Sequence, residues 1–381
     1  MIKNCPICNQ LIASNGFYYQ KECPVLNNVL YGSIAESMIA PTGELNIKQC
    51  KKCGFIFNAN YSPDLISYQK GYNSSRSNSR AYNNYVTSLI RTIKERIIVN
   101  SEVLEIGCGD GSFLKELSDT TRCSCWGYDP SCKGPKINSN NVKFIDDYFC
   151  PETNKRQFDV LIFRHILEHI WEPYQFLSKI VKRNVLKNNA LIVVEVPDHE
   201  WIITNLSFFD FTYEHCNYFN YSSLHYLLSR LNIQTIERKS VFKNQYILVF
   251  GVWSQNNQLN GLKNNNIIIN NFRQRVEKKK KKIIQIVKSA EVVCIWGASG
   301  KGVIFLSNFQ KEVAEKINFV VDIDPLKHGK FLPVSGKKVL HPESLNGNKK
   351  VVTVFVMNNI YKDEIQVILD KMNIKSQLII V

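Results

Sequence analysis

The stretch VLEIGCGDGSFL, residues 103–114, contains an apolar run, three glycines within five positions, and then a helix-like pattern. A strand, a glycine-rich turn and a helix in this order are typical of the first unit of a doubly wound α/β sheet. Glycine lets the backbone turn tightly and lets a ligand lie against the main chain. Gly107, Gly109 and Gly111 do not fit the dinucleotide fingerprint, whose third glycine comes one position later. We therefore expect a turn for another ligand.

Strand-like runs alternate with helical or loop stretches between residues 101 and 250, which predicts a parallel sheet flanked by helices. Residues 246–254 read as a further strand, and the Asn-rich stretch 255–266 reads as a linker. Similar runs in the last part of the chain predict a second α/β unit. The predicted fold class is therefore α/β: an N-terminal lobe at 1–75, a central Rossmann-like domain at 76–255, and a second Rossmann-like domain at 256–381.

The chain has 381 residues, of which 44% are hydrophobic, so it is long enough and apolar enough for a well-buried core. It has no apolar window of about 18 residues and no signal-peptide pattern, so we expect a soluble, cytoplasmic protein. Five of its net +15 charges lie in the run 278–282. This run is either the solvated face of a helix or part of a surface for acidic ligands.

Two cysteine pairs with two-residue gaps, CPIC at 5–8 and CKKC at 50–53, lie in the first segment. A tight turn aims both of its sulfurs at one point, so two such turns can present four thiolates tetrahedrally to zinc. A redox dithiol is the weaker alternative, since neither pair follows a strand and opens a helix. We expect Cys5, Cys8, Cys50 and Cys53 to bind one structural zinc, which leaves no open position for catalysis.

Carboxylates follow the next two predicted strands, Asp129 in WGYDP and Asp146 and Asp147 in VKFIDDY. Asp129 suits a ribose, because its two oxygens can accept bonds from vicinal hydroxyls. The turn and these carboxylates resemble the first motifs of class I S-adenosylmethionine-dependent methyltransferases. The resemblance implies that the turn holds the methionine and ribose of S-adenosylmethionine and that Asp146 or Asp147 approaches the adenine. The cofactor-binding residues that we expect are Glu105, Gly107, Gly109, Asp110, Gly111, Asp129, Pro130, Asp146, Asp147, Arg164 and His165.

Two histidine-bearing segments follow these motifs, FRHILEHIWEP at 163–173 and DFTYEHCNYF at 210–219. In each, a histidine follows a glutamate, and a neutral histidine is well suited to accept a proton near pH 7. Either histidine alone would more often be a structural residue than a catalyst. Both come after the cofactor motifs, near strand ends where open sheets bind ligands, and this favours a functional role.

The whole chain resembles the sugar C-methyltransferases that act on nucleotide-activated keto-deoxyhexoses. The resemblance rests on CPVLNNVLYGS at 23–33, CKKCGFIFN at 50–58, the Glu-His turn, WGASGKG and DIDPLKHGKFLP. It implies that His215 removes the proton beside a 4-keto group, with His169, Tyr72 and Glu214 assisting. This chain has Thr212 where the family often has tyrosine. The segment RHILEH also resembles a broader branch of methyltransferases in which His165 and His169 are both candidates.

The turn WGASGKG follows a predicted strand and opens a helix, so its N–H groups and Lys301 could hold a phosphate of the sugar nucleotide. A purely structural turn is the alternative. We expect Gly297, Lys301 and Gly302 to bind the substrate.

Two rival functions remain open. One is an O- or N-methyltransferase acting on a saccharide or small metabolite, which needs only one base. The other is a zinc-ribbon protein that binds nucleic acid through its basic charge. We expect a nucleotide-sugar substrate and no nucleic-acid or membrane partner. The sequence leaves open the oligomeric state, for which a monomer is one option, as well as the acceptor sugar, its nucleotide, the stereochemistry and the pathway.

Overall fold

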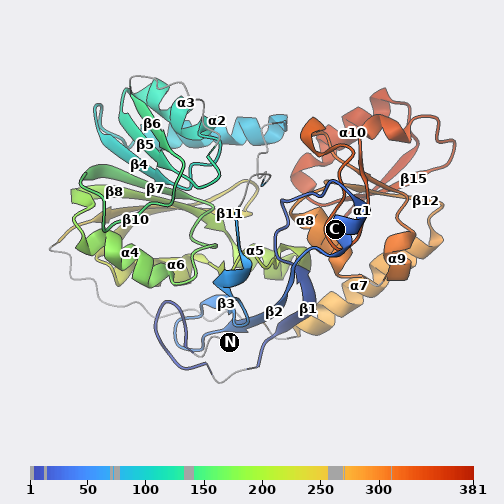
Figure 1. The fold of residues 1–381 in the computed structure, drawn as a ribbon, viewed down its shortest axis with the longest axis horizontal. Helices are drawn as coiled ribbons and strands as arrows, with labels where there is room; N and C mark the ends of the chain where they lie inside the picture. Colours follow the sequence, from blue (N-terminus) through green and yellow to red (C-terminus); the bar gives the residue numbers. More distant parts are fainter. Residues whose placement is uncertain are drawn as a thin grey trace.

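The computed structural model describes residues 4–12, 15–68, 72, 78–132, 141–255, 269, 271–309 and 311–381. In this part of the chain the strands form a four-stranded, a seven-stranded and a five-stranded sheet. Figure 1 shows the central and C-terminal sheets side by side, with the N-terminal strands along the lower edge between them. No helix among the described residues is long and apolar enough to cross a membrane.

The central sheet has the predicted alternation of strands and helices, with five parallel strands followed by an antiparallel hairpin. Its strands in spatial order are β6 (Val142–Ile145), β5 (Ser124–Tyr128), β4 (Glu102–Ile106), β7 (Phe158–Arg164), β8 (Leu186–Pro197), β11 (Tyr246–Trp253) and β10 (Ile233–Val241). Strand order reverses beside β4, and open sheets bind ligands at such a point. The glycine turn after β4 therefore lies where a ligand is expected.

Helices cover both faces of the central sheet, as expected for a doubly wound fold (Figure 1). They are α2 (Arg80–Lys94) and α3 (Ser112–Thr121) on one face, and α4 (Pro173–Lys182) and α6 (Tyr221–Ser229) on the other. Their apolar sides pack onto the sheet: Leu89 and Leu114 lie in one core, and Leu177 and Leu224 in the other. The predicted α/β fold class is confirmed.

The N-terminal sheet takes its last strand from a distant part of the sequence. Its order is β1 (Tyr18–Pro24), β2 (Thr42–Gln49), β3 (Ile56–Asn58) and β9 (Asn217–Tyr218), all antiparallel. One short helix, α1 (Ile34–Met38), joins β1 to β2. Since β9 begins two residues after His215, pairing with β3 fixes that histidine against the N-terminal lobe. The predicted domain limits stay a prediction.

The C-terminal sheet is parallel throughout, with helices on its two faces. Its strands in spatial order are β14 (Val339–Leu340), β13 (Phe319–Val321), β12 (Val292–Trp296), β15 (Val352–Val356) and β16 (Ser376–Ile380). The helices are α7 (Phe272–Ser289), α8 (Lys301–Ser307), α9 (Lys311–Glu315) and α10 (Lys362–Lys371). One face shares its core with β1 and β2, so the N-terminal lobe packs against this domain as well.

Short elements connect these units. Helix α5 (His199–Thr204) follows β8, and 3₁₀ turns lie at Pro63–Leu65, Phe208–Asp210, Pro325–Lys327, Pro342–Leu345 and Asn359–Tyr361.

The lysine run on α7 is only partly solvated: Lys279 donates to the carbonyls of Asn205 and Leu206, and Lys280 lies over the ring of Phe208. Burial lowers the pKa of Lys279 to about 8. This part of the run therefore anchors the segment after α5.

Candidate active site

A cavity of 810 Å³ lies between the central and C-terminal sheets. Its wall combines the glycine turn after β4, the two histidine segments and the turn after β12. The predicted site residues that line it are Tyr72, Glu105, Gly107, Gly109, Asp110, Asp129, Pro130, Asp147, Arg164, His165, His169, His215, Gly297 and Lys301. Four predicted residues do not line it: Gly111, Asp146, Glu214 and Gly302.

The three glycines of the first turn all have left-handed backbones, for different reasons. A Cβ on Gly107 would lie 2.0 Å from the side chain of Ile166, and one on Gly111 would lie 2.5 Å from Phe144. A Cβ on Gly109 would meet nothing within 4 Å. Gly107 and Gly111 therefore allow close packing, whereas Gly109 keeps the main chain open toward the cavity.

The carboxylates beside this turn hold its shape. Asp129 Oδ2 accepts a hydrogen bond from the Gly109 N–H at 2.9 Å, and Oδ1 accepts from the backbone and hydroxyl of Ser131. Asp110 accepts from the N–H of Ser112 at the start of α3. A carboxylate has about four acceptor sites, so Asp129 retains capacity for a ligand.

Glu105 and Arg164 form the floor of the cavity below the turn. Glu105 is 1% exposed, and its Oε2 has no hydrogen-bond partner among the described residues. Burial raises the pKa of Glu105 to about 8, although the charge of Arg164 opposes this. Arg164 lies over the ring of Phe113 and donates through Nε to Glu195 at 2.9 Å, while its Nη2 has no partner in the described chain. These unpartnered atoms suit a ligand that carries both charges.

His165 connects two buried carboxylates. It has a left-handed backbone with φ 55°, which is strained for a non-glycine residue. Its ring lies 3.2 Å from Glu195 and 3.4 Å from Glu168, as ion-pair contacts without hydrogen-bond geometry. Burial opposes protonation, but these carboxylates raise the pKa of His165 to about 9. His165 is therefore cationic at neutral pH.

Sequence reasoning missed Glu195, which lies on β8 and is fully buried. Besides Arg164, it accepts a hydrogen bond from the Tyr85 hydroxyl, 2.5 Å away. Arg164 and His165 hold the pKa of Glu195 below its usual range, although burial opposes this. The available signal was a lone charge inside the apolar run ALIVVEV at 190–196.

The two predicted catalytic histidines meet at the cavity. The rings of His169 and His215 lie 4.7 Å apart between centroids and nearly perpendicular, at 88°. His169 Nδ1 is hydrogen-bonded to the Tyr68 hydroxyl at 3.1 Å. The backbone N–H of His215 donates to the Thr212 hydroxyl, so Thr212 supports the loop at the position where the resemblance suggested tyrosine.

Glu214 turns toward the N-terminal lobe instead of lining the cavity. It accepts hydrogen bonds from the Tyr72 hydroxyl at 2.7 Å and from the backbone N–H of Asn27. Asn28 in turn donates to the Tyr72 hydroxyl at 3.2 Å. Burial raises the pKa of Glu214, while the charge of His169 and these hydrogen bonds oppose the shift. Glu214 thus fixes Tyr72, which does line the cavity.

The turn after β12 is more self-contained than predicted. A Cβ on Gly302 would lie 1.9 Å from the carbonyl oxygen of Gly297, so Gly302 is required for packing. Lys301 lines the cavity but is already bonded to Asp210 at 2.9 Å. Asp322 accepts from the N–H of Ala298 and pairs with Lys327 at 3.0 Å.

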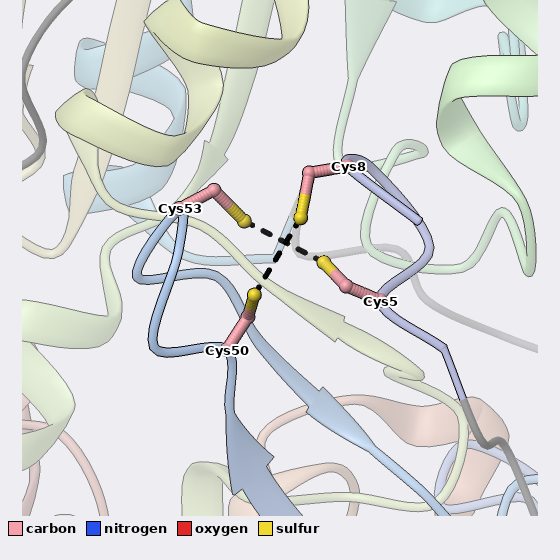
Figure 2. A group of neighbouring side chains, drawn as sticks. All are labelled: Cys5, Cys8, Cys50 and Cys53. Carbon is pink, nitrogen blue, oxygen red and sulfur yellow. Dashed lines mark hydrogen bonds between the residues drawn. The ribbon is translucent and has the colours of Figure 1, made fainter. Parts of the chain in front are cut away.

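The four cysteines converge at one point in the N-terminal lobe (Figure 2). Cys5 and Cys53 have sulfurs 3.5 Å apart, as do Cys8 and Cys50, and all four sulfurs lie within 4.8 Å of one another. Tetrahedral zinc with Zn–S bonds of about 2.3 Å requires sulfurs roughly 3.8 Å apart. The four thiols therefore fit one zinc ion with small adjustments.

Two family models match the chain. A methyltransferase domain matches residues 79–238, and a C-methyltransferase C-terminal domain matches residues 253–380. The chain is therefore an S-adenosylmethionine-dependent methyltransferase, as the sequence predicts. Its central sheet is the Rossmann-like sheet of the class I enzymes. No curated protein matches the chain significantly in sequence.

Several solved methyltransferases resemble part of the structure. Magnesium protoporphyrin IX methyltransferase from Synechocystis, with bound S-adenosylhomocysteine, is 13% identical over 50% of this chain and 90% of its own, with a TM-score of 0.37. The N-methyltransferase NodS from Bradyrhizobium japonicum is 15% identical over 46% and 97% of the two chains, with a TM-score of 0.34. A methyltransferase from Aquifex aeolicus is 14% identical over 44% and 97%, also at 0.34. TM-scores this low do not establish a shared function.

Proposed function

We propose that this methyltransferase transfers its methyl group to a carbon of a keto sugar attached to a nucleotide, and that His215 is the base. The match to a C-methyltransferase C-terminal domain supports transfer to carbon. The observation that carries the proposal is that one cavity is lined by the glycine turn, by the His169–His215 pair and by the turn after β12. Cofactor, base and acceptor can therefore meet without a large rearrangement.

In this proposal the cofactor lies at the glycine turn. S-adenosylmethionine supplies an electrophilic methyl group on its sulfonium when bound. Gly109 leaves the main chain accessible, Asp129 accepts hydrogen bonds from the ribose hydroxyls, and Asp147 approaches the adenine. The unpartnered carboxylate oxygen of Glu105 and the Nη2 of Arg164 bind the ammonium and carboxylate of the methionine part.

The acceptor carbon becomes nucleophilic through proton removal. His215 takes the proton from the carbon beside the ketone, and the electrons of that C–H bond form an enolate. His169 donates a hydrogen bond to the enolate oxygen. Tyr72, whose hydroxyl donates to Glu214 and accepts from Asn28, orients the sugar. His215 afterwards releases the proton to water.

The nucleotide part of the acceptor is proposed to lie against the C-terminal turn. Gly297 and Lys301 line the cavity there. Because Lys301 pairs with Asp210, a phosphate would have to share or replace that contact. Gly302 contributes by letting the turn form.

The experiment that tests this function is deuterium exchange. The protein is incubated with S-adenosylhomocysteine and a panel of nucleotide 4-keto-6-deoxysugars in heavy water, and deuterium beside the carbonyl is followed by mass spectrometry. We expect exchange that falls at least about 100-fold in His215→Ala. The matched control is His225→Ala. His225 is a half-buried histidine on helix α6 that is hydrogen-bonded to Thr235, and its loss should leave exchange unchanged.

No exchange with any keto sugar, together with intact cofactor binding, would overturn enolate chemistry. It would favour the alternative, methylation of a hydroxyl or an amine. Exchange that persists in His215→Ala would instead remove His215 from the role of base.

We also propose that the cysteine cluster binds one structural zinc ion. It lies in the core that the N-terminal lobe shares with α4 and α6, so metal loss should loosen this packing. Metal analysis of the purified protein should give one equivalent, absent from the double variant Cys50→Ser/Cys53→Ser and retained in Cys150→Ser, an exposed cysteine outside the cluster. A fully folded, metal-free wild type would refute the zinc site.

A further inference from the structure

Glu168 is a buried carboxylate that the proposed mechanism does not use. It lies in the turn after β7, is 1% exposed, and neither of its carboxylate oxygens has a hydrogen-bond partner among the described residues. Its backbone carbonyl accepts from the N–H of Asn217 at 3.1 Å, which joins this turn to β9. A buried carboxylate that accepts no hydrogen bond is costly, so its retention needs a cause.

The carboxylate of Glu168 faces the histidine pair. One of its oxygens and one ring nitrogen from each of His169 and His215 lie within 4.8 Å of one another. Glu214, the other carboxylate of these segments, is occupied by Tyr72 and Asn27. Among these two glutamates, Glu168 is therefore the one whose carboxylate is available to the two imidazoles.

A histidine ring lies against another side of the Glu168 carboxylate. His165 lies 3.4 Å from Oε1 of Glu168, and its other nitrogen faces Glu195. Because the pKa of His165 is raised to about 9, that imidazole carries a positive charge at neutral pH. The Glu168 carboxylate therefore lies between this imidazolium and the histidine pair.

We propose that Glu168 is a positioning residue whose anionic carboxylate favours and orients the imidazolium that forms when the His169–His215 pair takes up the substrate proton. The proposal rests on the function proposed above. The proton moves from the substrate carbon to the imidazole and not to Glu168. Among the described residues, the other titratable groups around the pair include Glu214, Tyr68 and Tyr218, all engaged in hydrogen bonds.

The same three side chains could in principle hold a divalent cation, since two histidines and a carboxylate form a common ligand set. The fixed positive charge of His165 beside Glu168 opposes a second cation. A proton on the imidazole pair satisfies the carboxylate with less repulsion. The structure therefore favours the proton, and metal binding becomes an outcome of the test.

The first measurement is independent of substrate: the histidine ring signals are followed by NMR as pH is changed, and His215 is assigned by the signal lost in His215→Ala. In Glu168→Gln we expect the titration midpoint of His215 to fall by about one pH unit, because the neutral amide no longer favours the protonated ring. Glu168→Asp should keep most of the wild-type midpoint. Glu172→Gln, an exposed glutamate four residues on, is the matched control and should change nothing.

The second measurement is the rate of deuterium exchange against pH. For Glu168→Gln we expect the rate to fall about 10- to 100-fold, with S-adenosylhomocysteine binding retained, and the acidic limb of the profile to move to lower pH. An unmoved midpoint and limb in a folded Glu168→Gln variant would overturn the proposal. Should that variant not fold, a His215 midpoint that falls by about one pH unit in Glu168→Asp, which keeps the charge, would also overturn the proposal.

A second zinc equivalent, retained by wild-type protein after desalting and lost in Glu168→Gln, would also overturn the proposal in favour of a metal site. Failure of the proposed function has a different signature. It would leave the wild type without exchange, whereas failure of the role of Glu168 would leave the NMR midpoint unmoved.

Discussion

The turn after β4 in the central sheet and the turn after β12 in the C-terminal sheet are built alike. In the first, the N–H of Gly107 donates to the carbonyl of Tyr128, and the N–H of Gly109 donates to Asp129. In the second, the N–H of Gly297 donates to the carbonyl of Val321. The N–H of Ala298 donates to the carboxylate of Asp322. Each glycine turn is thus fastened to an aspartate at the end of the neighbouring strand.

The electrostatic surroundings of the two aspartates differ. Among the described residues, the Asp129 carboxylate has only the hydroxyl and N–H of Ser131 as further partners, whereas Asp322 is paired with Lys327. Two residues before the first glycine, the central strand carries Glu105 and the C-terminal strand carries Ile295. Unpartnered buried polar atoms lie below the first turn, while Asp322 and Lys327 are both satisfied. The same backbone arrangement therefore lies above unpartnered buried polar atoms in the central sheet, whereas its aspartate is paired with a lysine in the C-terminal sheet.

The largest expected effect separates packing from binding in the second turn. Gly302→Ala places a Cβ 1.9 Å from a backbone carbonyl, so the backbone must shift. We expect a loss of about 3 kcal/mol or more in the free energy of unfolding, measured by urea denaturation. Cofactor affinity of the folded fraction should be unchanged. A stable Gly302→Ala variant with weakened substrate binding would instead make this glycine a binding residue.

The next effect contrasts the two aspartates through the same conservative change. Asp322→Asn leaves the buried ammonium of Lys327 without its counter-charge, and should cost about 2 to 3 kcal/mol of stability. Asp129→Asn should cost little stability but lower S-adenosylhomocysteine affinity on the order of 100-fold, measured by calorimetry. Equal effects of the two variants on both quantities would break the comparison.

Local patterns were sufficient to predict the central sheet, the cysteine cluster and most cavity residues. Strand alternation, turn glycines and the two-residue gap between Cys50 and Cys53 are all short-range signals. The resemblance implied that Glu214 assists the adjacent His215, and this role stays a prediction. The structure turns it toward Tyr72, because neighbouring residues in an extended loop point in different directions.

Long-range contacts set the rest. No local pattern indicates that Asn217 and Tyr218 form a strand with β3, since a two-residue strand exists only through its partner. The interpretation of the lysine run as a solvated helix face is wrong for Lys279. Its ammonium donates to the carbonyl of Leu206, 73 residues earlier in the chain. The role proposed for Glu168 likewise depends on a long-range contact, because His215 lies near Glu168 only in the folded protein.

A smaller effect tests the buried acid below the first turn. Folding raises the pKa of Glu105 from 4.5 to about 8, so the unfolded chain releases this proton at lower pH than the folded protein does. The free energy of unfolding of the wild type therefore falls as pH rises toward and through 8. Glu105→Gln removes this loss, so the variant should exceed wild type in unfolding free energy by about 2 kcal/mol at alkaline pH, with little difference near pH 4. Urea denaturation across this range measures it.

Glu102→Gln, half-buried on the same strand, is the matched control and should show no comparable gain. The gain from Glu105→Gln should come with weaker cofactor binding, since the variant loses the charge proposed to meet the ammonium. A variant that gains no stability at alkaline pH would show that Glu105 already has a partner in the free protein.

The smallest effect asks whether the open space at Gly109 is a binding surface. Gly109 and Gly347 both have left-handed backbones, with φ 56° and 77°, and neither has an atom within 4 Å of an added Cβ. Alanine at either position should therefore cost a similar strain of about 1 kcal/mol in thermal or urea unfolding. Only Gly109→Ala adds a methyl group to the cavity wall, so only that variant should weaken S-adenosylhomocysteine binding, by about tenfold. Equal binding in both variants would mean that the cofactor does not approach this part of the main chain, and the contrast between the two turns would then rest on Glu105 and Asp129 alone.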